Sequence, residues 1–370
     1  MSNMVDYVNW RGDIPLTLSN LNEIDKMILS RFSYFRFQKV NANDNDTIES
    51  ITTRLIETLK KEEYNIAGDY DLTRALNRSD RFKDLKVTDY FEILDEDVQK
   101  QFAAICIHLP ENVIYVSYCG TDDTMVGWKE DFNLSFMTGV PSQKEGVKYL
   151  NKIAQKYPEK KFILGGHSKG GNVAVYSGVF SQNDIRNRII EIVNHDGPGF
   201  DDEVLKMNSY KEIIDKVHTY IPQSSVFGRL LGHKEKYKIV KSNEKGIMQH
   251  DIYSWQVMGK KIIQMDKTTN GSDFIDITMR NWLKNIPMEE RKVVIDAIYS
   301  LVMTRNAKTW KEFNKKRYRN IGAVLRQYKT LSETDKEMIK DATNKLANAA
   351  KESLKLNFTE IGETQENNML

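Results

Sequence analysis

A serine set between glycines is the feature that most constrains this chain. The stretch "KFILGGHSKGGNVAVY" covers residues 161–176. Its apolar first half predicts a short buried strand, and its second half predicts a helix that begins near Lys169. A chain that passes from strand to helix through G-x-S-x-G needs Gly166 and Gly170, because a Cβ at either position would obstruct the turn. Ser168 is therefore expected at the carboxyl edge of a sheet.

Nucleophilic attack is the chemistry that such a turn supports. The helix behind Ser168 directs its first N–H groups and the positive end of its dipole at the place where an oxyanion would form. A glycine-rich phosphate loop is the other interpretation. That loop needs G-x-x-x-x-G-K-[ST] or G-x-G-x-x-G, and the chain has neither pattern. The sequence therefore predicts that Ser168 is a nucleophile.

Strands and helices alternate on both sides of this turn. The runs "FAAICIHL" and "VIYVSYCG" predict a hairpin before it, and "IIEIVNHDG", "VHTYIP" and "EKYKIVKS" predict strands after it. Helical segments between strands are typical of βαβ units around a mostly parallel sheet. We therefore predict an α/β core over residues 101–270. An N-terminal helical segment over 1–100 is expected to pack on this core, and a C-terminal helical extension is expected over 271–370.

Charge and cysteine content exclude several classes of protein. The 54 Lys and Arg residues nearly balance the 52 Asp and Glu residues, so the chain lacks the basic excess of a nucleic-acid binder. Cys106 and Cys119 are too few for a disulfide framework and have no metal-ligand spacing. No apolar signal region opens the sequence, and no run has eighteen apolar residues. We expect a cytoplasmic protein that uses neither a cofactor nor a metal.

The region around Ser168 resembles a known family. "GGHSKGGNVAVY" is similar to the nucleophile turn of the α/β-hydrolase fold, and in particular to the GHSxGG pattern of class 3 lipases. "IYVSYCGTDDTMVGWKEDF" resembles the lipase segment in which a strand ends in R-G-T or R-G-S and a tryptophan follows. Together with "VNWRGDIPL", "NEIDKMILS", "NHDGPGF" and "QHDIYSW", these motifs resemble the bacterial Mbeg1-like group over roughly residues 5–260. The resemblance implies an α/β-hydrolase fold and hydrolysis of a lipid or other acyl ester.

A serine nucleophile needs a histidine base, and in this fold the serine, the acid and the histidine follow one another in that order along the chain. His250 lies in "GIMQHDIYSW" after the last predicted core strand, where the resemblance also places the base. His233, in a charged loop, is the second candidate. His167 adjoins Ser168, but the geometry of the turn points it away, so we expect it to brace the turn.

The acid has more than one candidate. Class 3 lipases carry an aspartate after the strand that corresponds to "VHTYIP", where this chain has Ser224 and Ser225. One strand earlier, Asp196 follows the strand expected next to that of the nucleophile, so we predict that it orients His250. The alternatives are that Asp196 only forms an Asx-type turn, or that Asp251, Ser225 or a backbone carbonyl orients the histidine.

The oxyanion hole is predicted to use the backbone N–H of Lys169, the residue after the nucleophile. Its second donor is predicted in "YCGTDD", where Gly120 permits close approach and Thr121 offers an N–H and a hydroxyl. Cys119 replaces the arginine that is usual before this glycine. The alternative is that these residues only form a turn at the end of a strand.

Other segments allow two interpretations each. Residues 131–143 fit either a lid over the site or ordinary core packing. The basic run over 314–320 fits either contact with an anionic membrane surface or a solvated helix face. An acidic cluster near the site could hold a metal, but serine chemistry requires none and we predict none; it comprises Asp122, Asp123, Glu130 and Asp131. A non-catalytic binding protein, a thioesterase and a peptidase are the alternatives to an esterase, and the sequence leaves the oligomeric state undetermined.

Overall fold

The computed structural model describes most of the chain in two compact units. The described residues are 2–95, 97–121, 127, 130, 133, 134, 139–287, 290, 291 and 328–367, without the side chains of residues 275 and 354–367. The first unit comprises Met1–Asp122 and Pro141–Lys267, and the second comprises Asp123–Val140 and Thr268–Leu370. The sheet and the N-terminal helices belong to the first unit.

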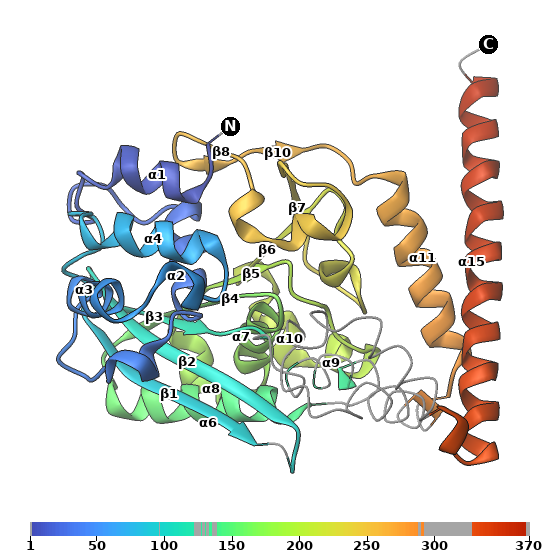
Figure 1. Ribbon diagram of the computed structural model, residues 1–370, viewed down its shortest axis with the longest axis horizontal. Coiled ribbons are helices and arrows are strands. Elements are labelled where there is room, and N and C mark those ends of the chain that lie inside the picture. Colours follow the sequence, from blue (N-terminus) through green and yellow to red (C-terminus); the bar gives the residue numbers. More distant parts are fainter. Residues whose placement is uncertain are drawn as a thin grey trace. The chain divides into compact units, whose positions relative to one another are not determined.

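The described part of the first unit is built on an eight-stranded sheet with the order β1-β2-β3-β4-β5-β6-β7-β10 (Figure 1). Strands β3 to β7 run parallel, whereas β1 and β2 on one side and β10 on the other pair antiparallel. The strands are β1 Val87–Asp95, β2 Lys100–Leu109, β3 Val113–Tyr118, β4 Lys161–His167, β5 Ile189–His195, β6 Val217–Pro222, β7 Tyr237–Val240 and β10 Gln264–Met265. The predicted α/β class with a mostly parallel central sheet is confirmed.

Apolar residues on both faces explain why the central strands are buried. Side chains alternate between the two faces of a strand. In β2, Ile105 and Ile107 join the core on one face, while Ala104 and Cys106 join the core on the other. Strands buried on both faces read as continuous apolar runs, and the predicted hairpin of β2 and β3 was recognisable for that reason.

The N-terminal helices cover one face of the sheet (Figure 1). Polar residues begin three of them: Asn3, Asn22 and Thr47 each accept hydrogen bonds from the first turn and form capping boxes. The apolar stripe of the second helix, including Ile24 and Ile28, is fully buried. These helices are α1 Met4–Arg11, α2 Glu23–Phe32, α3 Ile48–Thr58 and α4 Ala67–Asn77, with short 3₁₀ turns at Phe37–Val40 and Lys61–Glu63.

The crossover helices cover the other face and contribute the second core. The central one, α7, is buried from Lys169 to Val179 and packs beside β4 and β5. These helices are α6 Pro141–Lys156, α7 Lys169–Phe180, α8 Asn183–Arg188, α9 Asp202–Lys206 and α10 Asn208–Ile213. The unit closes with 3₁₀ turns at Ile214–Lys216, Phe227–Arg229, Gly246–His250 and Ile252–Ser254 and with the short strands β8 Val257–Met258 and β9 Lys261–Ile262.

The strand content begins earlier than predicted. The helical segment predicted over residues 1–100 contains β1, which pairs antiparallel with β2 from Val87 to Asp95. This strand lies at the edge of the sheet, and its second half is only partly buried. An edge strand needs few apolar residues, so "VTDYFEILD" lacks the continuous apolar run that marks the central strands.

The described part of the second unit contains two long helices, α11 Asn270–Asn285 and α15 Glu333–Asn367. They pack together where the Trp282 Nε1–H donates to the Ala342 carbonyl over 2.9 Å and where Ile286 meets Ala342. Helices are thus found in the described parts of 271–370. Among the helices that the structure describes, none has a segment long and apolar enough to cross a membrane.

Candidate active site

Ser168 stands at the turn between β4 and α7 in a backbone conformation that few side chains adopt. Its φ is 57° and its ψ is −132°, and its N–H donates to the His195 carbonyl over 2.9 Å. The flanking glycines leave room for this turn. A Cβ on Gly166 would lie 2.3 Å from the Gly170 carbonyl carbon, and a Cβ on Gly170 would lie 2.2 Å from the Tyr118 oxygen. The structure therefore has the strand–serine–helix turn predicted from the glycine pattern.

His250 lies beside Ser168, although 82 residues separate them in sequence. Its Nε2 is 2.9 Å from the Ser168 Oγ, within hydrogen-bond distance. The histidine ends the 3₁₀ turn Gly246–His250, and 22% of its side chain is exposed. The Phe227 ring packs against the imidazole at 4.3 Å between centroids. A histidine so placed can accept the serine proton and still meet a substrate from solvent.

Asp196 completes a chain of hydrogen bonds to the serine. Its Oδ2 lies 2.6 Å from the His250 Nδ1, and its side chain is fully buried. The other carboxylate oxygen accepts from the Ser225 hydroxyl over 2.5 Å and from the Gly228 N–H over 3.2 Å. Asp196 has a φ of 54° just beyond β5, and its N–H donates to the Tyr220 carbonyl of β6. Charge-assisted hydrogen bonds of this kind hold the carboxylate in one orientation.

The other residues weighed from the sequence have different partners. His233 places its Nδ1 2.8 Å from Glu235 in a nearly buried pair. Asp251 accepts from the Tyr253 N–H and caps the 3₁₀ turn Ile252–Ser254. The Ser225 hydroxyl donates to Asp196. The geometry brings together Ser168, His250 and Asp196, and it gives Ser225 a supporting position beside the aspartate.

His167 contacts the backbone of the proposed base. Its Nε2 lies 2.9 Å from the His250 carbonyl, so the ring donates there, while the Tyr34 hydroxyl donates to the His167 carbonyl over 3.0 Å. Burial lowers the pKa of His167 well below its usual value, and the neighbouring His250 lowers it further. A neutral His167 thus ties β4 to the turn that carries His250. The sequence predicted that His167 stabilises the turn, but it did not indicate that the ring donates to the His250 carbonyl.

The predicted oxyanion residues lie on two adjacent segments. Lys169 is the first residue of α7, and Thr121 follows the carboxyl end of β3. Gly120 packs against the turn that carries Ser168, because a Cβ on it would lie 2.5 Å from the His167 carbonyl oxygen. The Gly120 nitrogen also lies within 2.9 Å of the position that a Cβ on Gly170 would take. The loop before Thr121 therefore touches the start of α7.

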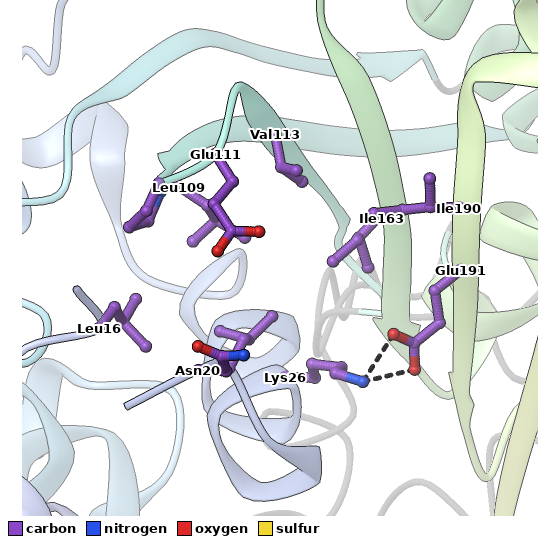
Figure 2. Close-up of a pocket in the computed structure, with 11 residues that line it drawn as sticks. Leu16, Asn20, Lys26, Leu109, Glu111, Val113, Ile163, Ile190 and Glu191 are labelled. Carbon is purple, nitrogen blue, oxygen red and sulfur yellow. Dashed lines mark hydrogen bonds and ion pairs between the residues drawn. The ribbon is translucent and has the colours of Figure 1, made fainter. Parts of the chain in front are cut away.

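A cavity lies near the amino ends of the parallel strands, at the end of the sheet opposite Ser168 (Figure 2). Val113, Ile163 and Glu191 line it from the amino-terminal halves of β3, β4 and β5, whereas Ser168 follows the carboxyl end of β4. The Lys26 ammonium pairs there with both oxygens of Glu191, at 2.5 and 2.6 Å. At about 180 Å³ the cavity is smaller than typical ligand pockets. The cavity therefore lies away from Ser168.

Some sequence-based predictions concern residues that lie outside the described ranges. These residues are the basic run 314–320, most of 131–138, and Asp122, Asp123 and Asp131. Among the residues that the structure describes, no group of three or more His, Cys, Asp or Glu side chains could hold a metal ion. Cys106 and Cys119 are both buried free thiols.

His195, directly before Asp196, leads to a prediction about acid stability. Its side chain is fully buried, and burial lowers its pKa to about 3. Between that value and about 6.5, the unfolded chain binds a proton that the folded chain does not, so acid favours unfolding. In His195→Phe, which keeps an aromatic ring against Tyr220, the pH dependence of the unfolding free energy should be shallower by up to about 1.4 kcal/mol per pH unit. Urea unfolding from pH 7.5 to 4.5 measures this pH dependence. Equal slopes in the wild type and the variant would contradict the lowered pKa of His195.

Solved structures similar to the chain include lipases, two of them described as fungal. The native Rhizomucor miehei lipase propeptide complex matches with a TM-score of 0.36 and 16% identity, covering 58% of this chain and 66% of that chain. The lipase from Rhizopus microsporus var. chinensis matches with a TM-score of 0.36 and 15% identity, covering 68% and 84%. A mutant form of MDLA from Penicillium cyclopium matches with a TM-score of 0.39 and 12% identity, covering 65% and 84%. At these values, the reaction has to be argued from this chain's own residues.

The fold and the family agree with the resemblance seen in the sequence. A mostly parallel sheet with flanking helices and a strand–Ser168–α7 turn is the arrangement of the α/β-hydrolase fold, as predicted. No curated protein matches the chain in sequence. The family model described as Mbeg1-like matches residues 76–300, which is more than half of the chain. The chain therefore belongs to the Mbeg1-like family.

Proposed function

We propose that the protein is a serine hydrolase that cleaves a carboxylic ester through an acyl-enzyme on Ser168. The observation that carries this proposal is the line of hydrogen bonds from Ser168 through His250 to the buried Asp196, at 2.9 and 2.6 Å. A nucleophile, a base and an orienting acid in this order are the arrangement that makes a serine hydroxyl reactive.

Each residue has a distinct part in the proposed reaction. The Ser168 Oγ attacks the ester carbonyl carbon while the His250 Nε2 takes its proton. Asp196 holds the proton on Nδ1, which keeps Nε2 free to accept, and stabilises the imidazolium that results. The tetrahedral intermediate collapses when His250 returns the proton to the leaving alcohol. Water, deprotonated by the same histidine, then releases the acid and restores the serine.

We propose that backbone N–H groups stabilise the negative charge of the tetrahedral intermediate by hydrogen bonds. The Lys169 N–H lies at the start of α7, where the positive end of the helix dipole favours negative charge. The proposed second donor is the N–H of Thr121, on the loop that touches the start of this helix. Donors on two packed backbone segments need little reorganisation as charge develops, which makes such sites effective.

The proposed substrate is a lipid ester or another acyl ester. The resemblance of the sequence around Ser168 to class 3 lipases and the ester chemistry of the three residues support this class. A thioester or a peptide would meet the same nucleophile, so the preferred leaving group (alcohol, thiol or amine) has to be measured. Rates should be compared for p-nitrophenyl esters of increasing chain length, for acyl-CoA and for peptide amides. The proposal expects the esters to be the best substrates.

A fluorophosphonate probe tests the nucleophile directly. Such a probe phosphonylates only a serine that a neighbouring base activates, and peptide mass spectrometry locates the label. We expect one label, on Ser168, that denaturation before probing abolishes. A folded wild-type protein that neither takes up the probe nor turns over any ester would contradict the proposed function.

A further inference from the structure

The side chain of Lys169 is buried, and the proposed mechanism does not use it. The residue follows the nucleophile and contributes its backbone N–H, yet its side chain is only 1% exposed. The ammonium group donates to the Gln101 backbone carbonyl over 3.0 Å and to the Gln101 Oε1 over 2.6 Å. Burying a lysine costs free energy unless acceptors satisfy its donors, and Gln101 supplies two acceptors.

Gln101 extends this contact to the loop that carries the proposed second donor. It is the second residue of β2 and is 5% exposed. Its Nε2 donates to the Gly120 carbonyl over 3.3 Å. Lysine can only donate and a carbonyl can only accept, so this pair of contacts allows one orientation of the Gln101 amide. A line of hydrogen bonds thus connects the Lys169 Nζ to the Gly120 carbonyl.

The Gly120 carbonyl and the Thr121 N–H belong to the same peptide group. In a planar trans peptide the C=O and the N–H point in opposite directions. A hydrogen bond that holds this carbonyl toward β2 therefore holds the Thr121 N–H in the opposite direction. The bond also polarises the peptide and makes its N–H a stronger donor.

We infer that the Lys169 side chain, acting through Gln101, positions the second oxyanion donor relative to the first. The inference rests on the proposed function, which assigns oxyanion binding to the N–H groups of Lys169 and Thr121. Lys169 then offers one donor directly and orients the other through its side chain. In this arrangement Lys169 and Gln101 are positioning residues, because their side chains act through the Gly120–Thr121 peptide and not on the substrate.

We call the hydrogen bonds from Lys169 through Gln101 to the Gly120 carbonyl the relay. Three variants test whether these contacts affect the reaction or whether the side chains are merely buried. Lys169→Met removes the ammonium but keeps the backbone donor and an apolar stem. Gln101→Leu removes the amide contacts to Lys169 and to the Gly120 carbonyl. Gln101→Glu keeps acceptors for Lys169 but leaves nothing to donate to the Gly120 carbonyl. We expect each to lower kcat for a p-nitrophenyl ester by about tenfold to a hundredfold, with KM nearly unchanged, because only the stabilisation of the oxyanion suffers.

Non-additivity distinguishes the relay from damage to the catalytic residues. The double variant Lys169→Met/Gln101→Leu should lose no more activity than the worse single variant, because both interrupt one line of contacts. Lys26→Met is the matched control, because it breaks the Lys26–Glu191 pair at the opposite edge of the sheet (Figure 2) and should keep wild-type kcat.

The outcomes identify which proposal fails. Wild-type kcat in Gln101→Glu, or losses that multiply in the double variant, would overturn the relay while leaving the serine hydrolase intact. A wild-type protein that fails to react with fluorophosphonate would instead overturn the proposed function. The Thr121 amide ¹⁵N shift, which is sensitive to hydrogen bonding at the preceding carbonyl, gives a readout without catalysis. It should move in Gln101→Glu and stay unchanged in Lys26→Met, and an unmoved shift in Gln101→Glu would contradict the relay.

Discussion

Ser168→Ala is expected to lower ester hydrolysis by roughly 10⁴- to 10⁶-fold, the range typical of a lost serine nucleophile. The hydroxyl is the group that the turn between β4 and α7 presents to the His250 Nε2 at 2.9 Å. Alanine keeps the backbone and removes only this oxygen. Initial rates on a p-nitrophenyl ester measure the effect, and uptake of the fluorophosphonate should be lost with it.

The control for this variant is a serine away from the site. Ser209→Ala, on α10, should keep wild-type turnover and wild-type labelling at Ser168. Melting temperatures establish that both variants are folded. If Ser168→Ala retained more than a tenth of wild-type turnover, the covalent mechanism would be wrong. Another group would then have to carry the chemistry.

Asp196→Asn is expected to lower kcat by about 10⁴-fold, as replacing the orienting acid does in other serine triads. Asp196 accepts the Nδ1 proton of His250 over 2.6 Å. An asparagine amide can turn its NH₂ toward Nδ1 and leave the proton on Nε2. The histidine then cannot accept the proton of Ser168, although the geometry is kept. Single-turnover kinetics with a p-nitrophenyl ester should show slow acylation and not weak substrate binding.

Asp251→Asn is the matched control for this prediction. Asp251 is adjacent to the same histidine, but its side chain accepts from the Tyr253 N–H, which an asparagine oxygen also does. Its kcat should stay within a few-fold of wild type. Equal losses in the two variants would point to a general effect of carboxylates near His250, and a large loss in Asp251→Asn alone would transfer the orienting role to that residue.

The neighbourhood of the nucleophile was predictable because its pattern is local. The turn needs both Gly166 and Gly170, which lie within one stretch of five residues. The clashes that a Cβ would meet at these positions arise from the turn itself and from the adjacent strand. The β2–β3 hairpin was recognisable for a similar reason, since two apolar runs flank a short turn. The edge strand β1 was not, because its exposed side removes the apolar run on which recognition depends.

The carboxylate that contacts His250 could be identified only from the tertiary structure. In sequence, Asp196, Asp251 and Ser225 were alternatives for the same role. The parallel pairing of β5 with β6 brings the loops after both strands together, so that Ser225 binds the far oxygen of Asp196 while His250 meets the near one. The sequence shows none of these distances, because the partners are 29 and 54 residues apart.

The sequence by itself determined that a serine stands on a glycine-bounded turn between a buried strand and a helix, because those constraints act between residues adjacent in the chain. Only the tertiary structure decided what surrounds that serine. It placed His250 and Asp196 in line with Ser168, and it turned the Lys169 side chain inward to Gln101. Hydrogen bonds between segments depend on how strands pair and helices pack, and the order of residues along the chain does not specify those distances.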